Sequence, residues 1–251
     1  MTPTDETHPA DPRSSLPSRS SLSVLAAATA THDTGLDDDI ALPKLPGFVE
    51  SAFSPLAYEV SGRCLTAHPG DGDRTAVALA SLMGDTTTAD LASRRMVSGR
   101  VHNPLLFMQA TANSVLGHMS REFGITGQMF SLSTLDDSLS ELLSMADLLL
   151  EDEELDRVLV LGVELGGGER VAAVHRELAA DSGLTFADLP ESAGLAAAVL
   201  LGRPCDAPGA PVLVRPTGTA GQPGSIQSLF ELATAHAEPR TETETHPHAH
   251  Q

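Results

Sequence analysis

The chain has 251 residues, of which 41% are hydrophobic, and it carries a formal net charge of −19 at pH 7. Its shortage of lysine and arginine argues against binding to nucleic acid or to an anionic membrane surface, because both need clustered cations. A chain of this length and composition is expected to form a packed globular domain. Because tryptophan is absent and aromatic residues make up 3%, the core is expected to consist of leucine, valine, alanine and methionine.

The N-terminal segment lacks the basic stretch and apolar run of a secretory signal, and no apolar run reaches the length of a membrane span. Cys64 and Cys205 form neither a disulfide framework nor a CxxC metal motif, so both are interpreted as buried thiols in a reducing compartment. His246, His248 and His250 alternate in the C-terminal tail, where no neighbouring structure would orient them as metal ligands. We therefore expect a cytoplasmic protein without a metal or an organic cofactor.

The composition divides the chain into a central domain and two tails. Residues 1–20 are rich in proline, serine and threonine and are predicted to be disordered. Residues 21–216 are assigned to the folded domain. Residues 217–251 are predicted to be a flexible acidic and histidine-rich tail, which includes a short amphipathic helix at residues 225–237.

Apolar runs and helical periodicities alternate along the central domain. Strands are predicted at residues 21–28, 74–81, 129–134, 157–163 and 194–201, with an edge strand at residues 212–214. Helices are predicted at residues 48–65, with an interruption at Pro55, and at residues 103–123 and 137–151. Strands and helices that alternate in this way are typical of an α/β fold with helices on the faces of a sheet.

The two later helices have clear termination signals. Helix 103–123 begins with Asn103 and Pro104, a helix cap followed by proline in the first turn, and it ends at Gly124. Helix 137–151 has a leucine-rich face and begins with Ser138 and Glu141 at the spacing of a capping box.

Two aspartates, Asp136 and Asp137, enter helix 137–151. The free backbone N–H groups and partial positive charge of a helix N-terminus suit an anion. We interpret these carboxylates first as capping groups and only second as an acid/base pair.

A series of short motifs follows this order of elements. The motifs are Asn103-Pro104, Ala112-Asn113 with Gly117 to Ser120, Phe123-Gly124 with Gly127, Ser131 to Thr134, Asp156 to Glu164, and Glu191 to Leu200. In their order and their residues, these motifs resemble the N-terminal half of the β-ketoacyl synthase family, and the resemblance covers residues 21–216. The resemblance implies one half of a thiolase-like fold, in which helices cover a mixed sheet.

The sequence departs from the family at the position of the catalytic nucleophile. When Ser133 and Thr134 are laid on the family motif, Asp136 stands where the family has cysteine. An aspartate cannot be acylated as a thiolate can, so the chain alone is not expected to catalyse a condensation. The family's second half, which carries two histidines that assist malonyl decarboxylation, has no counterpart in this sequence. Gln128 also replaces a proline of the family turn.

Members of the family that lack the cysteine are chain length factors. The resemblance implies a heterodimer with a complete, cysteine-bearing ketosynthase in type II polyketide or fatty acid synthesis, with polyenes among the products, and an acyl carrier protein that acts through that partner. It implies that strand 129–134 pairs across the dimer axis and that helix 103–123 lies near the same interface. The residues assigned to the acyl tunnel or interface are Leu106, Phe107, Met108, Thr111, Met129, Ser131, Ser133 and Asp136.

Other interpretations stay open at this point. Leu106, Phe107 and Met108 also fit an ordinary helix core. Asp136 with His118 as its base would suit a thioester decarboxylase or hydrolase, although a buried histidine bonded to a backbone carbonyl is the simpler reading of His118. A third alternative is a scaffold or regulatory pseudo-ketosynthase without contact to the acyl chain.

Overall fold

The computed structural model describes residues 22–99, 104–135, 137–182, 189–204, 213–214 and 226–237. The elements follow in the order β1 (Leu22–His32), α1 (Phe53–Ala67), β2 (Thr75–Ala80), α2 (Thr86–Val97), α3 (Pro104–Gln109), α4 (Ala112–Phe123), β3 (Met129–Leu132), α5 (Ser138–Leu149), β4 (Arg157–Leu165), α6 (Glu169–Ser182), β5 (Gly194–Gly202), β6 (Leu213–Val214) and α7 (Gln227–His236). The predicted tail at residues 1–20 lies outside the described residues, and so do residues 217–225 and 238–251 of the predicted tail 217–251, including the alternating histidines.

The strands form one mixed sheet in the order β3-β2-β4-β5-β1-β6. β2 is parallel to β3 and β4, whereas β5 is antiparallel to β4 and to β1. β2, β4 and β5 are nearly continuous apolar runs, as expected for strands that are covered on both faces. The predicted α/β fold with a mixed sheet is thus confirmed.

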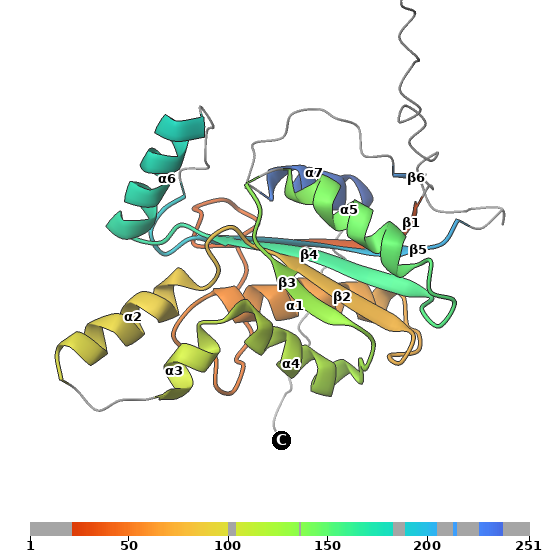
Figure 1. Ribbon diagram of the computed structural model, residues 1–251, viewed down its shortest axis with the longest axis horizontal. Helices are drawn as coiled ribbons and strands as arrows, with labels where there is room; N and C mark the ends of the chain where they lie inside the picture. The colour runs from red at the N-terminus through yellow and green to blue at the C-terminus, as the bar shows by residue number, and fades with distance from the viewer. Residues whose placement is uncertain are drawn as a thin grey trace, which may run out of the picture.

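Helices cover both faces of this sheet. α1 and α4 lie on one face, and α5 and α7 lie on the other (Figure 1). The side chains of β2 alternate between the faces: Val77 and Leu79 point to α1 and α4, whereas the intervening alanines point to α5. The small alanines leave room for Leu142 and Leu143 of α5, both of which are fully buried.

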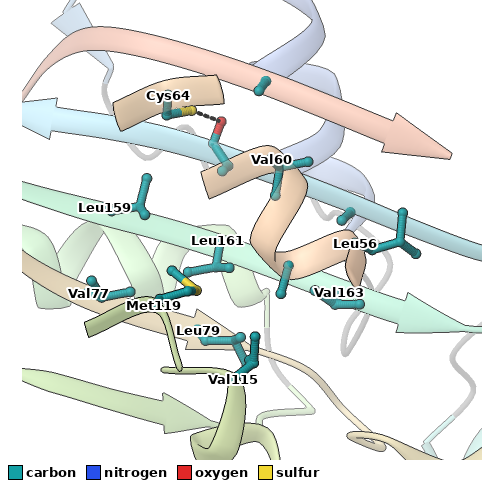
Figure 2. Close-up of a cluster of buried hydrophobic side chains, with 14 of the residues drawn as sticks. Leu56, Val60, Cys64, Val77, Leu79, Val115, Met119, Leu159, Leu161 and Val163 are labelled. Carbon is teal, nitrogen blue, oxygen red and sulfur yellow. Dashed lines mark hydrogen bonds between the residues drawn. The ribbon is translucent and has the colours of Figure 1, made fainter. Parts of the chain in front are cut away.

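The core under α1 and α4 consists mainly of aliphatic and sulfur-containing side chains (Figure 2), together with the aromatic ring of Phe53. Leu56 and Val60 of α1 meet Val115 and Met119 of α4 above the central strand β4, which contributes Leu161. All five are buried completely. Truncation of such a residue to alanine removes about 2–5 kcal/mol of stability, so this tryptophan-free core is enough to hold both helices on the sheet.

The predicted helix 103–123 is wrong in one respect, because the structure contains two helices with a break between them. α3 ends at Gln109 and α4 begins at Ala112, and the intervening Thr111 has an extended backbone with φ −85° and ψ 134°. Gly124 ends α4 as expected, with φ 65° in the left-handed region that favours glycine. Asn103 lies outside the described residues.

Three further expectations about helices change. Pro55 does not interrupt a helix, because α1 begins at Phe53 and the proline falls in its first turn, where no N–H is needed. The N-cap of α5 is Asp137 and not Ser138, and its carboxylate accepts from the backbone N–H of Ser140, so the capping box predicted for Ser138 and Glu141 is wrong. The sequence patterns did not predict α2 or α6.

The short helix predicted at residues 225–237 is present as α7. Its Leu229 and Ala233 are completely buried against the α5 face of the sheet. Gly162 of β4 has no room for a side chain, because an added Cβ would lie 2.6 Å from a methyl group of Ile226. α7 is therefore a close-packed part of the fold.

Candidate functional site

β3 is an edge strand of the described sheet, with β2 as its neighbour on one side. Met129 and Ser131 point to one face of the sheet, and Phe130 and Leu132 point to the other. Met129 packs against the core under α1 and α4, while Phe130 packs against the core under α5. An edge strand offers unpaired backbone groups to another chain, so β3 is suited to pair with a partner.

The predicted nucleophile position lies between the end of β3 and the start of α5. Asp136 is outside the described residues, whereas Leu135 before it is exposed and Asp137 after it caps the helix. One oxygen of Asp137, Oδ2, accepts hydrogen bonds from the backbone N–H and the hydroxyl of Ser140, at 3.2 and 2.7 Å. The other, Oδ1, is buried and has no hydrogen-bond partner in the described part of the chain.

The end of β3 is tied to the neighbouring strand by a side chain. The hydroxyl of Ser133 is exposed and donates a 2.9 Å hydrogen bond to the carbonyl of Leu82, just beyond β2. Ser131 is half-buried on β3. These two serines therefore line the edge strand that leads to the predicted nucleophile position.

The side chains of α3 point in opposite directions. Leu106 is 3% exposed and faces the body of the protein, whereas Phe107 is 45% exposed and Met108 is 63% exposed. Of the three tunnel candidates on α3, Leu106 is thus used in the protein's own packing. Phe107 and Met108 are free to meet another molecule.

Phe107 and Met108 are two of six exposed apolar side chains on three segments that contact one another, and we call these six the apolar corner. They come from the loop before α1, the end of α2, and α3: Val49, Met96, Val97, Leu105, Phe107 and Met108. α2 and α3 contact each other (Figure 1), and Gly47 lies against the side chain of Gln109 at the end of α3. Clustered exposed apolar side chains of this kind mark interaction surfaces.

Polar contacts hold the apolar corner in place. Glu50 forms an ion pair with Arg95 of α2 at 3.5 Å, which joins the loop to the helix. Asp85 caps α2 by accepting from the backbone N–H of Thr88 at 3.0 Å, and it also accepts from the hydroxyl of Ser51 at 2.7 Å. Burial raises the pKa of Asp85, and these hydrogen bonds oppose that rise.

α4 connects the apolar corner to the edge strand. It contacts α3 on one side and β3 on the other. Thr111, at the start of α4, is exposed and bonds to the carbonyl of Met108 at 2.8 Å. The structure therefore places the predicted interface residues that it describes in two groups, one on β3 and just after it and the other on α3 with Thr111, and α4 contacts both.

The alternative base His118 lies on α4, whereas Asp136, its proposed partner, is outside the described residues. Its ring makes edge-on contacts with Phe48 and Tyr58, at centroid distances of 5.8 and 5.6 Å. Its Nδ1 lies 3.2 Å from Arg121, so the expected bond to a backbone carbonyl is also replaced by a side-chain contact. α4, which carries His118, covers the face opposite α5.

Cys64 is unsuited to act as a nucleophile. It lies on the buried face of α1, 3.6 Å from the carbonyl of Ala198, and burial raises the pKa of its thiol to about 12. Cys205 lies outside the described residues. Within the described ranges, no cluster of three or more His, Cys, Asp or Glu side chains could hold a metal ion, and no helix is long and apolar enough to span a membrane.

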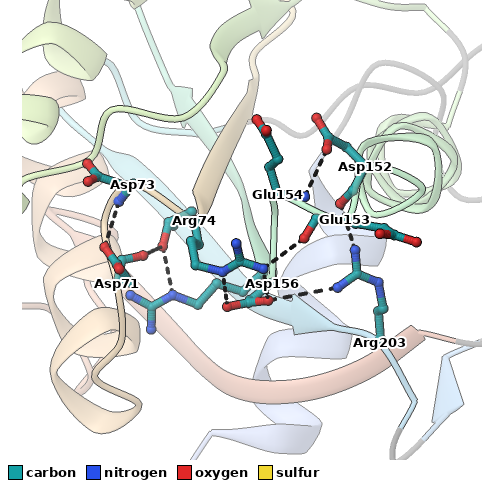
Figure 3. Close-up of polar contacts among 10 residues, drawn as sticks. Asp71, Asp73, Arg74, Asp152, Glu153, Glu154, Asp156 and Arg203 are labelled. Carbon is teal, nitrogen blue, oxygen red and sulfur yellow. Dashed lines mark hydrogen bonds and ion pairs between the residues drawn. The ribbon is translucent and has the colours of Figure 1, made fainter.

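The densest group of polar contacts lies at the other end of the parallel strands (Figure 3). Arg74 binds both carboxylate oxygens of Asp156, at 2.6 and 2.7 Å, and these hydrogen bonds lower the pKa of that carboxyl. Arg203 donates to the carbonyl of Asp152 at 2.6 Å. Arg157 is buried and donates to Thr75 at 2.8 Å. These contacts join the amino ends of β2 and β4, so their role is structural.

Comparisons with known proteins identify the architecture. No protein-family model and no curated protein sequence matches the chain. A solved structure described as the ketosynthase ApeO in complex with its chain length factor ApeC, from Xenorhabdus doucetiae, matches 86% of this chain and 91% of its own matched chain, with 18% identity and a TM-score of 0.58. The chain has a ketosynthase-like fold.

Two further solved structures share this ketosynthase-like fold, and in each of them the matched chain is longer than the part that aligns with this protein. One is an AntDE:AntF complex, described as a type II PKS acyl-carrier protein with its ketosynthase bound to the hexaketide, and the other is the ishigamide ketosynthase/chain length factor. Both have 14% identity and a TM-score of 0.52, and the chain covers 63% and 64% of their matched chains. The ketosynthase-like fold predicted from the motifs is therefore confirmed.

Proposed function

We propose that the protein is a chain-length-factor-like subunit, acting in the cytoplasm, that pairs with a complete ketosynthase and shapes its acyl tunnel. The observation that carries the proposal is the outward orientation of Phe107 and Met108 in the apolar corner, which α4 connects to the edge strand β3. A partner that pairs with β3 would cover both features. Two of the structures with the same fold are described as ketosynthases with chain length factors.

The proposed chemistry is confined to binding and shaping. The acyl chain would grow on the cysteine of the partner, because Asp136 stands at the nucleophile position of this chain. A bulky side chain at the floor of an acyl tunnel blocks further elongation, whereas a small one permits it. Phe107 and Met108 would form this floor, and Leu106, which is buried in the protein itself, would support them.

The substrate class would be a polyketide or fatty acyl chain attached to an acyl carrier protein. The net charge of −19 favours carrier docking on the partner, since an acidic carrier would be repelled by this subunit. The alternative of a thioester decarboxylase or hydrolase would need His118 to act as the base for Asp136; His118 contacts Phe48 and Tyr58 on the face opposite α5, and Asp136 lies outside the described residues.

The test is reconstitution with a ketosynthase that is encoded beside this protein. The two chains should co-purify, and Phe107→Ala or Met108→Ala should shift the products of the complex to longer chains. Leu148→Ala is the matched control, because Leu148 is equally exposed but lies on α5, across the sheet. If the wild-type protein does not bind the ketosynthase, the proposal is wrong. If product length is unchanged in both tunnel variants, the proposal is also contradicted, and the scaffold alternative remains.

A further inference from the structure

We propose that Thr111 and Ser114 are positioning residues that fix the orientation of α3 and so decide how far Phe107 and Met108 limit the acyl chain. The inference rests on the proposed function and adds a second layer of residues to it. Neither hydroxyl needs to touch the acyl chain. They would act through the break between α3 and α4.

The break is held together at one backbone oxygen. The carbonyl of Met108 accepts hydrogen bonds from the backbone N–H of Thr111 at 3.2 Å and from its hydroxyl at 2.8 Å. The hydroxyl of Ser114 also donates to this carbonyl, and the two hydroxyl oxygens lie 2.9 Å apart. Two side chains of α4 therefore converge on the last turn of α3.

This arrangement is unusual for the residue that begins a helix. Thr111 is the N-cap of α4, and the side chain of such a residue ordinarily accepts a hydrogen bond from a backbone N–H in the first turn. The hydroxyl of Thr111 makes no such cap and instead points back to Met108. The Thr111 hydroxyl therefore does not stabilise the start of α4 as a cap, and it forms a hydrogen bond to α3 instead.

α3 needs such a link because it is too short to be stable alone. It has six residues, and helices below about 12 residues are marginal in water without tertiary contacts. Leu106 is buried, whereas Leu105, Phe107 and Met108 are exposed. Besides Leu106, α3 is attached through its contacts with α2 and through Gln109, which lies against Gly47. The hydroxyl bonds to Met108 add an attachment at the end of the helix, where its orientation relative to α4 is set.

The chain offers a clean probe of this orientation. It contains no tryptophan, so Phe107→Trp would introduce a single indole on the exposed side of α3. In that background, Thr111→Val with Ser114→Ala should lower the fluorescence anisotropy of the indole and increase its quenching by acrylamide roughly twofold, since both hydroxyl bonds are lost. The measurement uses the full-length chain without a partner.

Thr234→Val is the matched control. Thr234 lies on α7, and its hydroxyl donates to the carbonyl of Phe230 at 2.8 Å, which is the same kind of bond within one helix. This substitution should change neither the anisotropy nor the quenching. Circular dichroism and thermal unfolding of all variants will show whether the fold is retained.

The second readout is the product of the complex with a ketosynthase. With native Phe107, the Thr111→Val and Ser114→Ala double variant should give a broader distribution of chain lengths than wild type when equal amounts of purified complex are compared. Unchanged anisotropy in the double variant, or an unchanged distribution while Phe107→Ala alters it, would overturn the positioning role. If Phe107→Ala also leaves product length unchanged, the proposed function itself fails, whatever the indole reports.

Discussion

The backbone N–H of Ile226, at the start of α7, donates a 3.0 Å hydrogen bond to the carboxylate of Glu164, near the end of β4. The contact joins residues that are far apart in the sequence and seats α7 on the sheet. Burial raises the pKa of Glu164 from 4.5 to about 7, although the hydrogen bond from Ile226 opposes the rise.

This relationship predicts a pH dependence of stability. Because the folded-state pKa is raised, the contribution of Glu164 is fully present below about pH 4.5 and is lost as the pH rises to about 7. Glu164→Gln keeps an acceptor for Ile226 but never ionises, so its free energy of unfolding should rise relative to wild type across this window. The gain should reach at most about 3 kcal/mol. Urea unfolding between pH 4 and 8 checks this.

The control for that measurement is Glu231→Gln, because Glu231 is an exposed carboxyl on the same helix. Its difference from wild type should be nearly independent of pH. A constant difference for Glu164→Gln as well would show that its carboxyl is not desolvated.

Gly127 and Gly117 should respond in opposite ways to alanine. A Cβ at Gly127 would lie 2.2 Å from the backbone oxygen of Thr75, so Gly127→Ala should cost about 3 kcal/mol or more. Gly117 is exposed within α4 with no neighbouring atom near its added Cβ, so Gly117→Ala should stabilise the protein by up to about 1 kcal/mol. Equilibrium unfolding of the pair tests this, and similar values for both would refute the packing at Gly127.

The cap of α5 predicts a graded effect at Asp137. Asp137→Ala removes the acceptor for the N–H of Ser140 and should destabilise the protein by about 1 kcal/mol. Asp137→Asn should cost much less, since asparagine caps helices about as well as aspartate. Thermal unfolding of the two variants measures the difference. An equal loss in both would mean that the charge, and not the hydrogen bond, is what stabilises this helix start.

Carrier docking on the partner predicts that basic residues of this subunit are dispensable for turnover. Charge reversal at Arg94 or Arg95 in α2, or at Arg100, which lies outside the described residues, should leave carrier-dependent turnover of the complex unchanged. Reversal of basic residues on the ketosynthase should abolish it. Arg95→Glu will also break the ion pair with Glu50, so partner binding should be measured in parallel. Equal losses on both subunits would be incompatible with this division of roles.

Much of the fold is readable from local pattern. β2, β4 and β5 are continuous apolar runs, and buried strands of a mixed sheet must have this composition whatever lies around them. Gly124 marked the end of α4 because few other residues adopt its positive φ. The sequence did not predict α2, because the helix has no strongly apolar face: Ala92 is its one buried hydrophobic residue.

The candidate site was only partly readable. The resemblance to the family predicted Phe107 and Met108 as tunnel residues, but it predicted Leu106 as well. The sequence pattern could not show which of these residues is buried in the protein's own packing. Val49, Met96 and Val97 were missed, because they join α3 through contacts between α2, α3 and the loop before α1. Exposed apolar residues give no periodic signal of their own.

The sequence by itself determined the alternation of strands and helices and the ketosynthase-like order of motifs, and it predicts an aspartate at the nucleophile position, since each depends on residue type and local spacing. The tertiary structure decided that the helix breaks at Thr111, that Leu106 points inward while Phe107 and Met108 point outward, and that α7 lies on the sheet beside Glu164. The physical reason is that burial and hydrogen bonding depend on neighbours that are distant along the chain.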